Sequence, residues 1–302
     1  MLSWLKGFGA CALVLAALCG GGCRQVEARI ERPGEIAAAD VVEETSFSLS
    51  VSPDAPGGGD SEPGLGAAAG SLAGKIWSLP GLVIEDSREI VTTDNNLFWL
   101  LAAAGGSIAL RQGGGDDRIW DNFQDNPWVS DHKDLDKFVD YAGCPGIHFA
   151  AAGLWYLSSA SKGDAVGTRN SWTLFEALAV NGAATLALKL IVNDDTPSGK
   201  SLAWPSGHTS SSFTVAAVLD ELYGPEVGIP AYLGAGFVGY RMMDSGDHWA
   251  SDVLFGAVLG YIVGHSVAQK YEAPEVAGFE LTPYTDVVGE RFVTGVGFVK
   301  EF

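Results

Sequence analysis

Apolar residues recur at intervals of three and four along most of the chain after Leu97, a spacing that places them on one face of a helix. Glycine- and proline-containing breaks separate the periodic stretches, as at Gly113, Pro127, Gly163 and Pro197. The stretches predicted to be helical are 95–110, 118–126, 145–161, 171–193, 207–223, 229–242 and 249–270. The pattern therefore predicts an all-α fold, a bundle of helices.

Residues 278–302 show a different pattern, in which apolar and polar residues alternate around Gly289. A period of two is typical of strands, so this segment is predicted to form a short C-terminal β-hairpin. An outer-membrane barrel needs many such strands, and the sequence offers too few of them.

The first residues have the pattern of a secretory signal. Lys6 precedes an apolar run, 7–18, that is too short to span a bilayer, and small residues then lead to Cys23. The small residues before Cys23 resemble a bacterial lipoprotein cleavage site, with Gly20 in the place where such sites usually have leucine. Three outcomes stay open: a lipid anchor at Cys23, plain cleavage and a retained anchor. The favoured prediction is an exported lipoprotein of the periplasm or cell envelope.

Residues 23–80 are predicted to be a flexible tether, because the runs 53–59 and 63–66 are rich in proline and glycine. Such a tether would give the helical domain reach away from an anchor. The predicted organisation is a signal peptide at 1–22, the tether at 23–80, a helical domain at 81–275 and a C-terminal extension at 276–302.

Composition excludes several classes of protein. Hydrophobic residues make up 47% of the 302 residues, enough for a large core, which argues against a disordered chain. The formal net charge is −19, so the chain lacks the basic excess that nucleic-acid binding requires. Of the four cysteines only Cys144 lies beyond the leader, too few for an intramolecular disulfide or a zinc cage. No metal site is predicted.

Two predicted helices are long and apolar enough to raise the question of membrane insertion. The stretch 172–192 contains Glu176 and Asn181, and 249–268 contains Asp252 and His265. These polar residues, with a mean hydropathy of only +0.16, favour helices buried inside a large soluble bundle. The alternative is a bundle in or across the membrane, with the polar residues facing a site.

Three segments carry the residue types of an anion-binding site. Lys189 ends an apolar helix, and the run Pro205-Ser206-Gly207-His208 opens the next one. Backbone N–H groups and the positive end of the helix dipole would face an anion there, and Gly207 lets a ligand approach the backbone.

The third segment supplies a further cation and an imidazole. Arg241 adds positive charge, which an acidic protein needs around an anionic substrate. Asp252 follows His248 by four residues, so that a helix beginning near His248 would let the carboxylate hold the imidazole in one tautomer.

The order of these motifs resembles the type 2 phosphatidic acid phosphatase superfamily, which includes bacterial acid phosphatases and vanadium haloperoxidases. The resemblance rests on Lys189 before Pro197, on the Pro-Ser-Gly-His run, and on Arg241 followed by His248-Trp249-Ala250-Ser251-Asp252. It covers about residues 145–270. It implies a helical bundle of that superfamily's kind, which hydrolyses phosphomonoesters or lipid and isoprenoid (pyro)phosphates without a cofactor. The implied partners are a phosphorylated small molecule or lipid, and the membrane.

The resemblance also implies a role for each matching residue. His248 would attack phosphorus and form a phosphohistidine, Asp252 would orient His248, and His208 would protonate the leaving group and then activate water. The phosphate oxygens would be held by Lys189, Arg241, Ser206, Gly207 and, where the family has an arginine, Thr196.

Two departures from the family pattern bear on activity. Thr196 stands before Pro197 in place of the arginine, and losing one preorganised donor costs about 10²–10³ in rate. The spacing from Arg241 to His248 is one residue longer than usual, and Tyr240 replaces the usual serine. The missing arginine predicts a weakened, specialised or degenerate phosphatase. Lys200, four residues after Thr196, could replace the missing charge, which would explain how the site tolerates threonine.

Less specific interpretations stay open for some residues. Lys189 alone could cap its own helix, and Asp252 could be only a helix cap. His148 and His265 are predicted to be hydrogen-bonded interior or rim groups, and His132 belongs to a charged surface segment. The alternative functions are a degenerate phosphate-binding scaffold and a haloperoxidase, which alone would need vanadate as cofactor.

Overall fold

The computed structural model describes residues 63–93, 95–271, 275–276, 279–288 and 291–299. Its helices are α2 (Leu65–Thr92), α3 (Asn96–Gln112), α4 (Gly115–Asp125), α5 (Lys133–Gly143), α6 (Pro145–Ser161), α7 (Ala165–Val192), α8 (Gly207–Tyr223), α9 (Pro225–Asp244) and α10 (Ala250–Gln269). The strands are β1 (Glu275–Val276), β2 (Phe279–Val288) and β3 (Arg291–Val299). The predicted all-α bundle is confirmed. The predicted signal peptide, Cys23 and the first part of the tether lie outside the described residues.

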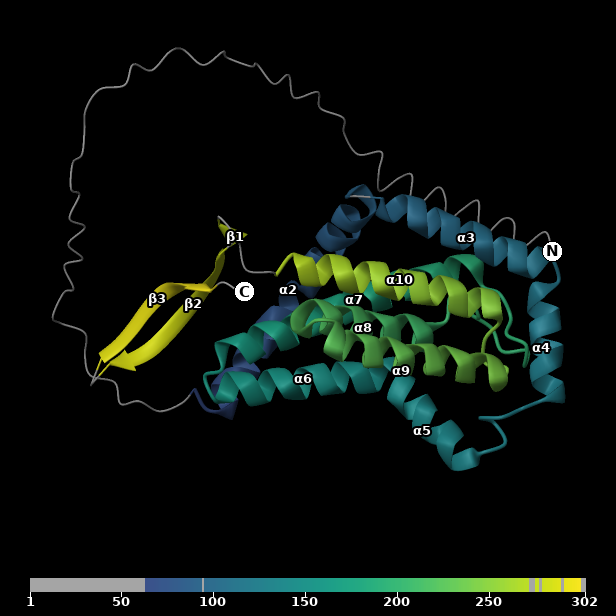
Figure 1. The fold of residues 1–302 in the computed structure, drawn as a ribbon, viewed down its shortest axis with the longest axis horizontal. Helices are drawn as coiled ribbons and strands as arrows, with labels where there is room; N and C mark the ends of the chain where they lie inside the picture. Colours follow the sequence, from purple (N-terminus) through teal and green to yellow (C-terminus); the bar gives the residue numbers. More distant parts are fainter. Residues whose placement is uncertain (1–62, 94, 272–274, 277–278, 289–290, 300–302) are drawn as a thin grey trace, which may run out of the picture.

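The longest helices run side by side (Figure 1). α8 lies at the centre, packed against α7, α9 and α10, while α6 and α2 cover α7. α3 packs on α10, and α4 crosses one end of the bundle near the start of α10 (Figure 1). The short α5 packs chiefly on α9 at that same end. The ends of four core helices and two short helices therefore meet there.

The hydrophobic core extends between α7, α8 and α10 and reaches the loop that precedes α8. Trp204, in that loop, is fully buried and packs on Phe255 of α10, with ring centroids 4.2 Å apart. The buried tryptophan side chain anchors the loop in the hydrophobic core. The loop delivers Ser206, the N-cap residue of α8, to a fixed place.

α8 and α10 approach closely because α10 presents glycines at intervals of four. A Cβ at Gly256 would lie 2.8 Å from the carbonyl oxygen of Ser206, and one at Gly264 would lie 2.7 Å from that of Thr214. Gly260, between them, faces the carbonyl of Ser210 at least as closely. Only glycine lets the two backbones pack at this distance.

The predicted tether is wrong from residue 65 onward, because α2 occupies 65–92. Gly64 caps this helix, the alanines at 67–69 are strong helix formers, and Pro80 is tolerated inside it. Tertiary contact outweighs the proline: Ala68 is buried, and Ser71 Oγ lies 2.8 Å from the hydroxyl of Tyr156 on α6. Among the described residues the helices thus begin at Leu65, earlier than the predicted boundary at 81.

The structure also contains α5, where sequence analysis predicts only a charged surface segment. Val139 is buried against Val238 and Met242 of α9, so a tertiary contact stabilises this helix. The other predicted helices are present, and two of them, α6 and α8, have the predicted bounds. The predicted C-terminal hairpin is formed by β2 and β3, which pair antiparallel from Glu280↔Val299 to Val288↔Arg291.

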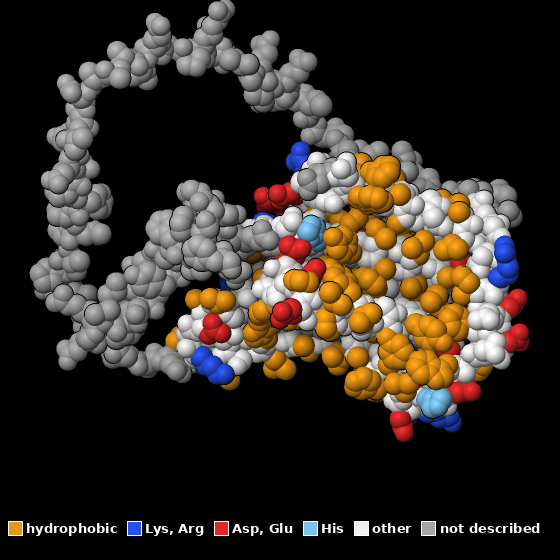
Figure 2. Space-filling view, viewed as in Figure 1, with side chains coloured by type: hydrophobic (Ala, Val, Ile, Leu, Met, Phe, Trp, Pro, Cys, Tyr) orange, Lys and Arg blue, Asp and Glu red, His pale blue; other side chains and the backbone are white. Residues whose placement is uncertain are grey.

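Within the part of the chain that the structure describes, three helices are long and apolar enough to cross a membrane: α2, α7 and α10. Large apolar side chains are also exposed over much of the bundle, and Figure 2 shows them spread over the face formed by α3, α8, α9 and α10. Examples are Phe98, Trp99, Ile229, Leu233 and Tyr261. The predicted preference for a soluble bundle does not account for this surface, since soluble monomers rarely expose such extended apolar area.

Candidate active site

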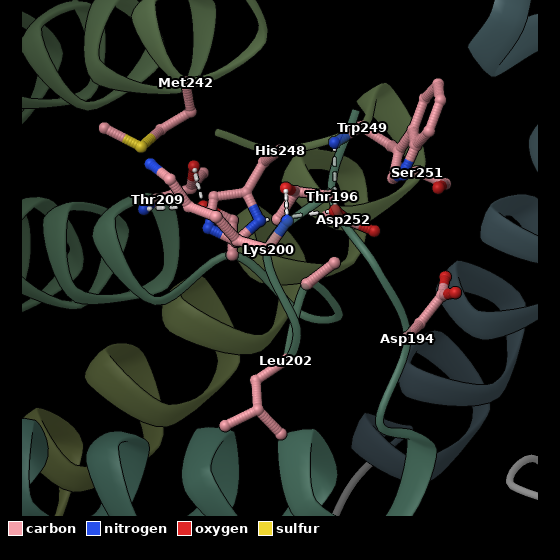
Figure 3. A network of polar contacts seen from close by, with 12 residues as sticks. Asp194, Thr196, Lys200, Leu202, Thr209, Met242, His248, Trp249, Ser251 and Asp252 are labelled. Atoms are coloured by element: carbon pink, nitrogen blue, oxygen red, sulfur yellow. Dashed lines mark hydrogen bonds and ion pairs between the residues drawn. The ribbon is translucent and has the colours of Figure 1, made fainter. Parts of the chain in front are cut away.

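The candidate residues come together at one end of the bundle from five segments. Lys189 lies in the last turn of α7 and Arg241 near the end of α9. Ser206 and His208 lie at the start of α8, and Asp252 lies in the first turn of α10. Figure 3 shows His248 and Asp252 beside the loop that carries Thr196, Lys200 and Leu202.

His248 and Asp252 form the predicted pair. His248 Nδ1 lies 3.2 Å from Asp252 Oδ2, and the Trp249 backbone N–H donates to the same oxygen at 2.9 Å. His248 stands in the loop just before α10, with its own N–H donating to the Met242 carbonyl. Because the carboxylate can only accept, Nδ1 carries the proton and the lone pair lies on Nε2. The pair therefore presents a nucleophilic nitrogen.

A polar cluster that sequence analysis missed fixes the start of α10. Asp116 of α4 accepts from the Ser251 backbone N–H at 2.9 Å and from its hydroxyl at 2.6 Å. Ser107 of α3 donates to the Ser251 carbonyl at 2.7 Å. Burial raises the pKa of Asp116, while its bonds to Ser251 oppose the rise. α3 and α4 thus fix the position of Ser251, the residue next to Asp252.

Ser206 acts in the structure as a buried N-cap. Its Oγ accepts from the Thr209 backbone N–H at 3.4 Å and lies 2.9 Å from the Thr209 hydroxyl. Its backbone N–H donates to the Asp252 carbonyl at 3.1 Å, which ties the start of α8 to α10. The predicted phosphate contact of its hydroxyl therefore competes with capping.

Gly207 and Lys189 lie on the same side of this helix start. A Cβ at Gly207 would lie 3.8 Å from Lys189 Cε and from Thr185 Cγ2, so both side chains lie over the backbone there. Lys189 Nζ donates to the carbonyls of Leu202 and Ala203, the latter at 3.1 Å. It thus reaches the loop before α8, which disagrees with the interpretation that it caps its own helix. Leu202 has φ 64°, a strained conformation for leucine that aims its carbonyl at the lysine.

Arg241 is buried among three carboxylates. Its Nε lies 2.7 Å from Asp136 Oδ1, and its Nη1 lies 2.9 Å from Asp140 Oδ1 and 2.8 Å from Asp247 Oδ2. Asp136 and Asp140 belong to α5 and were not among the predicted site residues. Their spacing of four is the sequence feature that could have placed both on one helical face.

His208 lies opposite the same arginine, in the first turn of α8. Its Nε2 is 3.6 Å from Asp140 Oδ1, the carboxylate oxygen that also pairs with Arg241. Burial lowers the pKa of His208, and the negative charge of Asp140 partly opposes this. A pKa lowered from the usual value of histidine favours the neutral imidazole at neutral pH.

Thr196 closes the loop between α7 and α8. Its N–H donates to the Lys200 carbonyl at 2.8 Å, and its Oγ1 accepts from the Lys200 N–H at 3.0 Å (Figure 3). The Lys200 side chain is 70% exposed and pairs with Asp247 Oδ1 at 2.8 Å. Lys200 thus contacts the carboxylate that also binds Arg241, so its positive charge lies at the edge of the site.

The remaining histidines have structural partners, as predicted. His148 bonds to Ser211 Oγ and to the Ala142 carbonyl, both at 2.7 Å, and His265 pairs with Glu221. His132 contacts the Trp128 carbonyl. Among the described residues no group of three or more histidine, cysteine or acidic side chains is arranged to hold a metal ion.

Comparison with known proteins finds one curated relative and two solved structures that are similar to parts of this chain. A lipid A 1-phosphatase from Porphyromonas gingivalis is 40% identical over 65 residues, which is 20% of this chain but only 15% of that protein. The structure of Aquifex aeolicus LpxE superposes with a TM-score of 0.44 and 20% identity, covering 51% of this chain and 94% of that one. A transmembrane PAP2-type phosphatidylglycerolphosphate phosphatase from Bacillus subtilis superposes with a TM-score of 0.45 and 17% identity. The match covers 58% of this chain and 92% of that one.

The sequence profile of the PAP2 superfamily matches residues 170–274. That range contains Lys189, the Pro-Ser-Gly-His run, Arg241, His248 and Asp252, the residues that the fold brings together at one end of the bundle. This chain therefore carries a PAP2 superfamily segment at residues 170–274, as the order of its motifs predicts.

Proposed function

We propose that this chain is a phosphatase that removes phosphate from a lipid through a phosphohistidine on His248. The observation that carries the proposal is the pairing of His248 Nδ1 with the buried Asp252, which leaves Nε2 as the nucleophile. Arg241, Lys189 and the start of α8 bring positive charge and N–H donors to the same end of the bundle as His248. Such donors stabilise charge that develops on the phosphoryl oxygens in the transition state.

The chemistry runs in two steps. His248 Nε2 attacks phosphorus as the bond from phosphorus to the ester oxygen breaks, and protonated His208 gives its proton to the leaving alkoxide. Neutral His208 then takes a proton from water, which attacks phosphorus and breaks the bond to Nε2. Inorganic phosphate leaves and both histidines return to their starting states. Asp252 stabilises the positive imidazole ring while Nε2 carries the phosphoryl group.

A lipid substrate is supported by the apolar exterior. α2, α7 and α10 could each cross a bilayer, and the exposed apolar side chains would then face lipid. A phosphate on a lipid headgroup would meet the site at the end of the bundle without leaving the membrane surface. The similarity to a lipid A 1-phosphatase agrees with this substrate class.

The N-terminal segments belong to the same proposal. A signal peptide at 1–22, with lipid attachment at Cys23, would export the chain, and the residues from 23 to the start of α2 would form the tether. The helical domain then acts at the outer face of the cytoplasmic membrane or elsewhere in the cell envelope.

The test is to trap the intermediate. Full-length protein in detergent micelles, mixed with a radiolabelled lipid phosphomonoester and quenched in alkali, is expected to carry an acid-labile label on His248. His248→Ala should lose both label and turnover, whereas His265→Gln, on α10 and outside the site, should keep both. Label on Ser206 or Asp252, or undiminished turnover in His248→Ala, would contradict the mechanism. Phosphate binding without any turnover by the wild type would favour a scaffold.

A further inference from the structure

The cations of the site are outnumbered by carboxylates. Within the network around Arg241, one carboxylate, Asp140, stands where a substrate oxygen would have to bind. Its Oδ1 lies 2.9 Å from Arg241 Nη1 and 3.6 Å from His208 Nε2. A phosphate oxygen that binds both groups must take the place of that oxygen.

Asp140 is also the carboxylate that can leave most easily. Its side chain is 41% exposed, against 26% for Asp136 and Asp247, and its ion pairs join only Arg241 and His208. Asp247 is held in addition by Lys200 and by the Ser245 hydroxyl. Asp140 is the more solvated carboxylate and has fewer partners, so displacing it from Arg241 costs less than displacing Asp247.

After displacement the carboxylate stays close, because Asp140 is fixed to α5, which packs on α9 and α8. Asp136, one turn earlier on α5, remains on Arg241 Nε. The phosphate then binds beside at least one negative charge, and the repulsion grows with the charge of the phosphate. A phosphomonoester changes from a monoanion to a dianion near pH 6.

We propose that Asp140 determines the charge preference of this site: it competes with the substrate for Arg241 and His208, so that the monoanionic phosphate group binds better than the dianion. The inference rests on the proposed function, since it takes Arg241 and His208 as phosphate contacts. Four charged or titratable groups lie around Asp140. They are Arg241 on α9, Asp247 in the loop after α9, His208 on α8 and Asp136 on α5 itself. His148, from α6, bonds to Ala142 and Ser211.

The experiment measures binding of inorganic phosphate and hydrolysis separately. Asp140→Asn keeps the size of the side chain and removes its charge. Its dissociation constant for phosphate should fall about three- to fivefold at about pH 8, and much less at about pH 5. In the hydrolysis assay KM should fall in parallel at high pH, with kcat less affected. Asp134→Asn, on the same helix but without an ion pair to the site among the described residues, is the matched control and should change neither quantity.

Because Asp140 also influences His208, the binding measurement is repeated in a His208→Gln background. The tighter binding of phosphate by Asp140→Asn at high pH should persist in that background, since it comes from removing the repulsion between Asp140 and the phosphate at Arg241. Unchanged phosphate affinity in Asp140→Asn at both pH values would overturn the proposal even if the wild type is an active phosphatase. Tighter binding at high pH in a protein without turnover would support the charge preference while contradicting the proposed hydrolysis.

Discussion

The glycines that let α10 pack against α8 also control the geometry of the site. Replacing Gly256 with alanine puts a Cβ 2.8 Å from the Ser206 carbonyl oxygen, at the N-cap of α8. Replacing Gly264 puts one 2.7 Å from the carbonyl of Thr214, eight residues further along α8 and about 12 Å away. The two substitutions overlap carbonyl oxygens of α8 to nearly the same extent, and the Cβ at Gly264 also meets Ala217 Cβ at 2.8 Å.

The magnitudes follow from the geometry. Ordinary van der Waals contact for a Cβ begins at 3.4 Å, so either alanine forces the helices apart locally by more than half an ångström. Overpacking of this kind costs about 1–3 kcal/mol, and alanine regains about 1 kcal/mol of helix propensity. A net loss of up to about 2 kcal/mol is expected for both variants. Since a 1 Å misplacement of catalytic groups costs about 10²-fold, Gly256→Ala should lower kcat about tenfold.

The assay compares thermal stability and steady-state kinetics of both variants in the same detergent. Gly264→Ala should lose similar stability but keep kcat within about twofold, because Ser206 and Asp252 stay in register. Gly234→Ala, whose Cβ meets no atom within 4 Å, controls for the substitution itself and should change neither quantity. Equal losses of kcat in Gly256→Ala and Gly264→Ala would refute the idea that the contact at Ser206 sets the site geometry.

Two further predictions concern the loop residues around Arg241. Lys200→Ala should lower kcat/KM by about tenfold, because Asp247 then neutralises Arg241 more fully. Adding Thr196→Arg to this variant should restore part of the loss. Undiminished activity in Lys200→Ala would contradict this prediction. Burial alone would raise the pKa of Asp247, but bonds from Lys200 and Ser245 and the charge of Arg241 hold it below its usual value. The ionised form therefore stabilises the fold above about pH 4, and that contribution is lost as the pH falls further. As the pH falls below about 4, the melting temperature of Asp247→Asn should therefore decrease less than that of the wild type. Equal decreases in the two proteins would exclude this contribution.

Local sequence features predicted the helices with strong boundaries. Pro145 at the first position of α6 and Ser206 as the N-cap of α8 are typical starts, and Gly224 follows the end of α8. The contact of His248 with Asp252 was predictable because it spans four residues at a helix start. These contacts need only local geometry.

The missed elements depend on tertiary contacts. α5 has few apolar residues, and its helix is stabilised by burying Val139 against Val238, far away in the sequence. The pairing of Asp136 with Arg241 joins residues 105 positions apart, so that no periodicity could reveal it. The segment that forms α2 was predicted to be a tether because of its prolines and glycines. Its alanines favour a helix, and packing on α6 and α7 stabilises that helix in the fold.

The gathering of the site at one end of the bundle has a consequence for where the reaction occurs. The C-terminal ends of α7 and α9 and the N-terminal ends of α8 and α10 meet there, and α7 is 28 residues long. At 1.5 Å per residue such a helix is about 42 Å long, enough to span a bilayer. If the proposed lipid phosphatase lies across the membrane in this way, it would reach the phosphates of one leaflet only. Lipids of the opposite leaflet become substrates only after they have been flipped, so the rate of lipid translocation would limit how completely the membrane is dephosphorylated.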